Sequence, residues 1–219
     1  MRRPCCGKYA ADRVRGPLAC VLIAGALIAI AACAPLATPE SGSWEISRNR
    51  LEFVNEGKLL LLDVDVRAAK LTGPSEFLPL QVLVKNHGRQ TLRVERESFV
   101  LERPDGMRLP ICSIEEFHRD YHGGLSDTHL GAQFLDRIAG RFPEPPFHWQ
   151  PMDFFPLRTG AAVSRDRIDL RFGDVVYGYV YFRQPNLDPR GLRGVYKLLM
   201  KPGGTDTTFV VDLVPYALR

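Results

Sequence analysis

The sequence lacks the short motifs that mark common hydrolytic active sites. It contains no G-x-S-x-G nucleophile elbow and no H-E-x-x-H zinc-protease motif. It also has no internal repeat and no low-complexity tract. These absences leave no sequence support for catalysis, and we expect a protein that is not an enzyme.

Cysteine is scarce beyond the N-terminal region. Four of the five cysteines lie at or before residue 33, and only Cys112 follows. One thiol cannot form an intramolecular disulfide, so packing alone must hold the domain together. A lone thiol is most often a small buried apolar group, which is the role we expect for Cys112.

A net positive charge is missing from most of the chain. Residues 1–33 hold five of the 29 basic residues and one of the 25 acidic residues, so the remainder carries 24 of each. Nucleic-acid binding needs a positive field, and no run of lysine or arginine supplies one. We therefore expect no nucleic-acid partner.

The chain does have an uncharged apolar run from Leu18 to Cys33, LACVLIAGALIAIAAC. A leader with five basic residues and one acidic residue precedes it. A basic leader, a short apolar run and small residues at its end are typical of a secretory signal. The run is shorter than the roughly 20 apolar residues that a spanning helix usually needs.

The end of this run reads Ile30-Ala31-Ala32-Cys33 and resembles the lipobox of bacterial lipoproteins, with Ile30 where that family prefers leucine. The resemblance implies a signal peptide over 1–32 and a covalent lipid on Cys33 that anchors the protein in a membrane. Ala34 stands where an inner-membrane retention signal would often place aspartate. The resemblance therefore implies the outer membrane, with the domain in the periplasm. An ordinary cleaved signal and an uncleaved anchor helix stay open as alternatives.

The rest of the chain predicts a tether over 33–43 and a mainly β domain over 44–219. Residues 58–68 and 78–85 alternate apolar and polar or charged side chains, as strands do. Turn signals at 86–88 and 104–106 separate further extended runs, and we expect a tight hairpin at the first of them. The run 175–182 is apolar on both faces, which indicates a central strand. The spacing favours an antiparallel β-sandwich.

A second resemblance rests on three segments. They are Val82 to Asn86, Ser98 to Leu101 before Pro104-Asp105-Gly106, and Tyr177 to Phe182 after Gly173-Asp174. Over 58–110 and 166–214 the chain is similar to the immunoglobulin-like domains of exported bacterial proteins. The similarity implies an immunoglobulin-like sandwich that acts as a binding or adhesion module, and it supplies no catalytic residues.

Residues 111–165 break the pattern and predict an insertion. Residues 114–121 predict a helix with Ser113 as N-cap and Glu116 completing a capping box. Residues 130–142 predict a second helix, with possible caps at 126–128. The crowded prolines and rings of 142–156 predict an irregular loop. Asp63 and Asp65 alternate with the apolar stripe of their strand, and we expect them to face water.

Candidate metal ligands lie in the insertion. They are Cys112, His118, His122 and His129. These residue types bind zinc or copper, and a helix would place His118 and His122 on one face. Glu115 or Asp127 could replace one ligand. The alternative is a buried thiol and ordinary histidines near a helix end. Apart from the lipid on Cys33 and this possible metal, we expect no cofactor.

Candidate binding residues lie in the aromatic loop. They are Phe147, Trp149, Phe154 and Phe155. Interfaces favour such rings, although the same rings could instead cap the sandwich core. The first hypothesis is thus a lipid-anchored envelope module that binds an envelope protein through the insertion. Metal handling is the second hypothesis, and a hydrolase without a recognisable motif is the third.

Overall fold

The computed structural model describes residues 43–46, 51–72, 75–139, 148–157, 163–183 and 195–213. The expected signal peptide and Cys33, the residue expected to carry the lipid, lie outside these ranges. Among the helices within them, none has the length and apolarity that a bilayer crossing requires.

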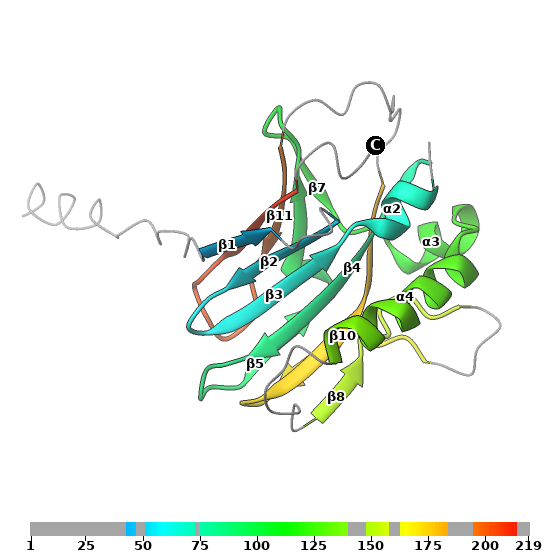
Figure 1. The fold of residues 1–219 in the computed structure, drawn as a ribbon. Coiled ribbons are helices and arrows are strands. Elements are labelled where there is room, and N and C mark those ends of the chain that lie inside the picture. Colours follow the sequence, from blue (N-terminus) through cyan, green and yellow to red (C-terminus); the bar gives the residue numbers. More distant parts are fainter. Residues whose placement is uncertain are drawn as a thin grey trace, which may run out of the picture. The chain divides into compact units, whose positions relative to one another are not determined.

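Strands in three sheets carry the fold (Figure 1). The largest sheet has the order β1 (Ser43–Ile46), β2 (Glu52–Glu56), β3 (Leu60–Asp65), β4 (Phe77–Asn86), β10 (Asp174–Arg183), β8 (His148–Pro151). The second has the order β12 (Phe209–Leu213), β11 (Tyr196–Met200), β6 (Phe99–Glu102), β7 (Arg108–Pro110). A ribbon joins β5 (Leu92–Glu95) to β9 (Arg167–Leu170). The prediction of a mainly β, antiparallel fold is confirmed.

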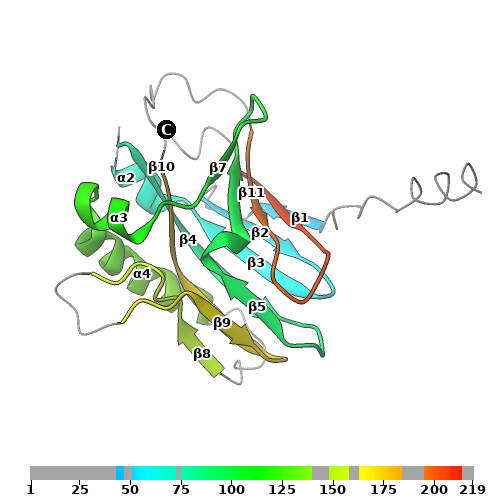
Figure 2. The ribbon, with the colours of Figure 1, turned by 180° about the vertical axis from the view of Figure 1, so that it is seen from behind.

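The core lies between the six-stranded and the four-stranded sheet. One face of β3 and β4 supplies Leu62, Val64 and Val82, and the facing sheet supplies Leu198 and Val211, all fully buried in one cluster. Figure 2, the view from behind, shows β11 on the near side of β2 and β3. The apolar side chains whose alternation predicted β3 and β4 are therefore the ones that point into this core.

The position of β10 confirms the prediction of a central strand. It pairs with β4 on one side and with β8 on the other. Its two faces pack in different clusters, because Val176 and Val180 belong to the main core and Val175 packs with Phe134 of the helix α4 (Gly124–Ala139). This explains a run that is apolar at odd and even positions.

One turn prediction is confirmed and another is wrong. Gly106 has a φ of 82° in the turn that joins the antiparallel strands β6 and β7. Residues 86–88 form no hairpin, because β4 pairs with β3 and β10, whereas β5 pairs with β9. The Asn86 side chain is committed instead to the carbonyls of Gln90 and Leu170, at 2.8 and 3.0 Å.

Within the described ranges, three α-helices and a short 3-10 helix, η2 (Arg96–Ser98), accompany the sheets. The helix α2 (Arg67–Thr72) was not predicted. The predicted cap of α3 (Ile114–Asp120) is confirmed, because Ser113 and Glu116 form a reciprocal capping box. The helix α4 (Gly124–Ala139) begins before residues 126–128, so these are first-turn residues and not caps.

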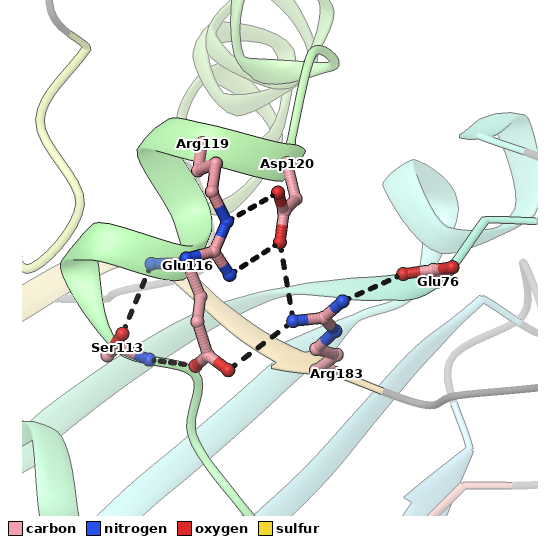
Figure 3. A network of polar contacts seen from close by, with 6 residues as sticks. All are labelled: Glu76, Ser113, Glu116, Arg119, Asp120 and Arg183. Carbon is pink, nitrogen blue, oxygen red and sulfur yellow. Dashed lines mark hydrogen bonds and ion pairs between the residues drawn. The ribbon is translucent and has the colours of Figure 1, made fainter.

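An ion-pair cluster holds α3 at the end of β10 (Figure 3). The Arg183 guanidinium lies 3.1 Å from Glu76, 3.3 Å from Asp120 and 3.5 Å from Glu116. Its carbon also lies 5.9 Å from the centroid of the Phe77 ring. One side chain of β10 therefore joins α3 to the residue that precedes β4.

The second face of the six-stranded sheet lies against α4, which corrects one expectation. Asp63 and Asp65 are only 4% and 2% exposed. They do alternate with the core stripe, as the sequence indicates. The other side of β3 does not face water, however, because the insertion returns across it.

The aromatic stretch before Pro156 is not wholly irregular, because His148–Pro151 forms β8, parallel to β10. Directly after it, the Met152 backbone donates a hydrogen bond of 2.6 Å to the carbonyl of Tyr177. A Cβ atom at Gly178 would lie 2.6 Å from the Met152 Cβ and 2.8 Å from its carbonyl oxygen. This close approach of two backbones requires glycine at 178.

Gly178→Ala should therefore lower the free energy of unfolding, because the Met152 backbone must move. Overpacking of this kind typically costs about 1–3 kcal/mol. Urea unfolding of the purified variant and the wild-type chain measures the difference. Equal unfolding midpoints would show that the contact at Gly178 is not tight.

Candidate functional site

A row of polar side chains crosses four strands beneath α4. The strand register aligns Glu52 with Asp65, Asp65 with Gln81, and Gln81 with Tyr179. Directly opposite residues project from the same face of a sheet. Glu52, Asp65 and Gln81 are at most 3% exposed. The face that α4 covers is therefore polar along this row.

The helix approaches the row through a glycine. A Cβ at Gly131 would lie 3.3 Å from the Gln81 amide nitrogen and 3.4 Å from a ring carbon of Tyr179. The same Gln81 nitrogen donates a long hydrogen bond, 3.4 Å, to the Gly131 carbonyl. Further along the helix, Phe134 and Ile138 pack with Leu83 of β4. Gly131 thus sets how close the helix lies to Gln81 and Tyr179.

An ion pair fastens the C-terminal half of α4. The Arg137 Nη2 lies 2.5 Å from the buried Asp65 carboxylate, and Arg67 lies 3.6 Å from the same oxygen. The Arg137 guanidinium also lies 5.5 Å from the Phe134 ring centroid. A buried carboxylate needs such partners to offset its loss of hydration.

A carboxylate fastens the N-terminal half of α4. Asp127 Oδ2 accepts hydrogen bonds from the hydroxyls of Tyr121, at 2.6 Å, and Tyr181, at 3.0 Å. Asp127 is 2% exposed. Burial raises the pKa of Asp127 and is the largest influence on it, whereas the two tyrosine hydrogen bonds lower it.

Aromatic rings surround this carboxylate. The Phe117 ring centroid lies 4.6 Å from that of Tyr181 and 5.4 Å from that of Tyr121, and the Phe155 centroid lies 5.1 Å from that of Tyr181. Such a cluster excludes water, which is why the Asp127 pKa rises.

A cavity of about 330 Å³ lies between α4 and β10. We call it the tyrosine groove. Its floor is formed by Gln81, Tyr177, Gly178, Tyr179 and Tyr181. One wall comes from α4, with Gly124, Thr128, Gly131, Ala132 and Leu135. The other wall comes from Pro151, Met152, Asp153, Phe155 and Leu157. Small residues on the helix side keep the groove open.

The groove contains an unmet hydrogen-bonding group. The Tyr179 hydroxyl is buried and has no hydrogen-bond partner among the described residues. Burial raises the pKa of Tyr179, and the charges of Asp127 and Asp65 raise it further. A buried neutral hydroxyl that lacks a partner is an unsatisfied donor and acceptor beside the groove, and such groups are uncommon in folded proteins.

A second hollow, of about 550 Å³, lies between α2 and the start of α4. Its rim carries the exposed side chains Leu71 and Leu125. Its lining shares Asp127 with the cluster above, but both tyrosine bonds to Asp127 are already made. The tyrosine groove is the better candidate because it has a free hydroxyl.

The four predicted metal ligands are not gathered. Cys112 is buried, and burial, with Glu116 as a smaller contribution, raises its pKa to about 12, so the thiol is not a thiolate. His118 Nε2 lies 2.8 Å from the Pro156 carbonyl. His122 follows Tyr121, which is extended after the end of α3, so the expected shared helical face with His118 does not form.

His129 is exposed on α4 beside Gln133. Among the residues with described positions, no three His, Cys, Asp or Glu side chains form a group that could hold a metal. Neither Glu115 nor Asp127 belongs to such a group among the described residues. Metal binding stays a prediction for direct metal analysis.

The candidate aromatic residues have different places. Phe154 and Phe155 are 0% and 9% exposed and belong to the main core, as the alternative of a core cap proposed. Trp149 is partly buried, and its ring centroid lies 6.0 Å from that of Tyr177. Phe147 lies outside the described residues. Of these rings, Phe155 lines the groove.

The residues of the groove were not among the sequence candidates. Gln81 was the available signal in the sequence, because it is a polar residue within the otherwise apolar run FLPLQVLV. Tyr177, Tyr179 and Tyr181 alternate along β10, which placed them together on one face. Neither Gln81 nor the alternating tyrosines indicates that α4 packs over this part of the sheet.

Asp127→Asn tests the raised pKa of Asp127. In the folded state the neutral acid is favoured, so its stabilising effect is complete below the ordinary value of 3.8 and is lost as pH rises through the higher folded pKa. The wild-type free energy of unfolding should therefore fall relative to that of Asp127→Asn between pH 3.8 and neutrality. Urea unfolding across this range measures it, with the exposed Asp136→Asn as control. A difference that is constant with pH contradicts the argument.

Comparison with known proteins finds no relative of this chain. No protein-family model matches the chain, and no curated protein or solved structure is significantly similar to it. The chemistry of the groove therefore has to be argued from its own residues.

Proposed function

We propose that this protein is a lipid-anchored binding module of the cell envelope and that the tyrosine groove is its ligand site. The observation that carries the proposal is the Tyr179 hydroxyl, buried at the groove without a partner among the described residues. Ligand sites are mostly apolar hollows with a few placed polar groups. Rings, a glutamine amide and one free hydroxyl fit that description.

A binding role is favoured over catalysis by the chemistry of the lining. Within the described lining residues there is no serine, cysteine or histidine to serve as nucleophile or base. The Thr128 hydroxyl is already donated to the Gly124 carbonyl, at 2.9 Å. What the groove offers a ligand is ring surface and hydrogen bonds.

The place of action is part of the proposal. Ile30-Ala31-Ala32-Cys33 supports a lipid on Cys33, and the proline-containing tether after it supports a domain held close to a membrane in the periplasm. We further propose that the two packed sheets are an immunoglobulin-like sandwich. Their shared core supports this, as does the hydrogen bond of 2.8 Å from Asn55 to the carbonyl of Val210.

Ala132→Trp should abolish binding at the groove, because Ala132 is an exposed helix residue that lines it. The neighbouring exposed Gln133 does not line it, so Gln133→Trp is the matched control. Ligand-observed NMR with a panel of neutral, cationic and anionic fragments should give hits with the full chain. We expect at least a tenfold loss of affinity in Ala132→Trp and less than a twofold loss in Gln133→Trp.

Circular dichroism and the melting temperature verify that both variants fold. Two results oppose the proposal. One is a panel without a single hit at millimolar concentration. The other is a set of hits that persist in Ala132→Trp.

Labelled palmitate tests the anchor. It should enter the wild-type protein and the Cys112→Ser control, but not Cys33→Ser, because only the Cys33 sulfur is expected to carry lipid. Label that is absent from the wild type, or that survives Cys33→Ser, would remove the anchor from the proposal without affecting the groove.

A further inference from the structure

The described lining of the tyrosine groove is acidic. Among its described lining residues the one charged side chain is Asp153, and no lysine or arginine lines it. The Arg165 guanidinium lies 3.9 Å from the Asp153 carboxylate, and both side chains are partly exposed. An exposed pair at this distance is weak, so Asp153 keeps most of its capacity to attract a cation.

Acidic groups also stand behind the floor. Asp127 and Asp65 both act on the Tyr179 hydroxyl and disfavour its ionisation, whereas Arg137 has a smaller effect in the opposite direction. The Arg137 guanidinium is occupied by Asp65. An anionic ligand would therefore meet the Asp153 carboxylate without a basic side chain in the described lining of the groove.

The rings of the floor are free of cations. Arginines lie over Phe77, Phe134 and Phe155, at 5.5–5.9 Å from the ring centroids. No such contact is recorded for Tyr177, Tyr179 or Tyr181 within the described part of the chain. Tyr179 and Tyr181 lie 6.0 Å apart. Tyrosine faces attract cations, most strongly where water is excluded.

We propose that the ligand of the tyrosine groove is a small organic cation of the quaternary ammonium class, held against Tyr177 and Tyr179 with its charge toward Asp153. This inference rests on the proposed ligand site. The volume of about 330 Å³ lies at the small end of the range for ligand sites, which suits a compact head group.

A pair of isosteric probes tests the charge directly. Choline and 3,3-dimethylbutan-1-ol have nearly the same shape, but only choline is charged. Each is titrated into the full chain in a neutral maltoside detergent and followed by calorimetry. We expect choline to bind at least tenfold more tightly than the alcohol, which corresponds to about 1.4 kcal/mol.

Variants locate the effect. Asp153→Asn should weaken choline about fivefold and leave the alcohol unchanged, whereas the exposed Asp136→Asn, outside the groove, should change neither. Ala132→Trp should remove choline binding, because the indole fills the groove.

Equal affinity for the two probes overturns the inference and leaves the ligand site standing. The inference is also overturned, and the ligand site stands, if choline does not bind while fragment hits sensitive to Ala132→Trp persist. Choline binding that survives Ala132→Trp overturns the inference as well, because the cation then binds elsewhere. The ligand site itself fails only if the fragment hits also survive Ala132→Trp.

Discussion

The structure depends on two buried carboxylates that hold α4 to the sheet. Asp127, in the first turn of the helix, accepts hydrogen bonds from two tyrosines. The carboxylate of Asp65, on β3, accepts a hydrogen bond from Arg137 in the last turn of α4. Removing a carboxylate from water is costly, and leaving one without its partner is costlier still. The helix can therefore neither slide nor rotate on the sheet without exposing one of these pairs to that penalty.

The groove follows from this attachment. With both ends of α4 held, Gly131 brings the helix backbone close to Gln81 and Tyr179, while Gly178 lets the Met152 backbone approach from the other side. Two glycines thus set two close contacts of residues that line the groove. The hollow is a product of backbone packing and does not depend on the rotamer of one flexible side chain.

Much of the fold was predictable because it is written in local patterns. The period of two in β3 and β4, the two apolar faces of β10 and the Ser113–Glu116 capping box were read from neighbouring residues and found as expected. The failures concern a helix end and contacts between distant segments. Asp63 was expected in water because its strand does not reveal that α4 covers it. His118 and His122 were expected together because the sequence does not show that α3 ends at Asp120. The groove joins residues 81, 131, 153 and 179, whose proximity is a property of the tertiary structure alone.

The short strand β8 has a consequence for how this protein behaves among its own copies. It lies at one border of the six-stranded sheet, with a partner on one side only in the described part of the chain. Such a border invites another chain to add a strand and begin an aggregate. Here the strand is four residues long and ends in Pro151, which has no amide hydrogen to offer. Growth of the sheet by strand addition at β8 is therefore disfavoured.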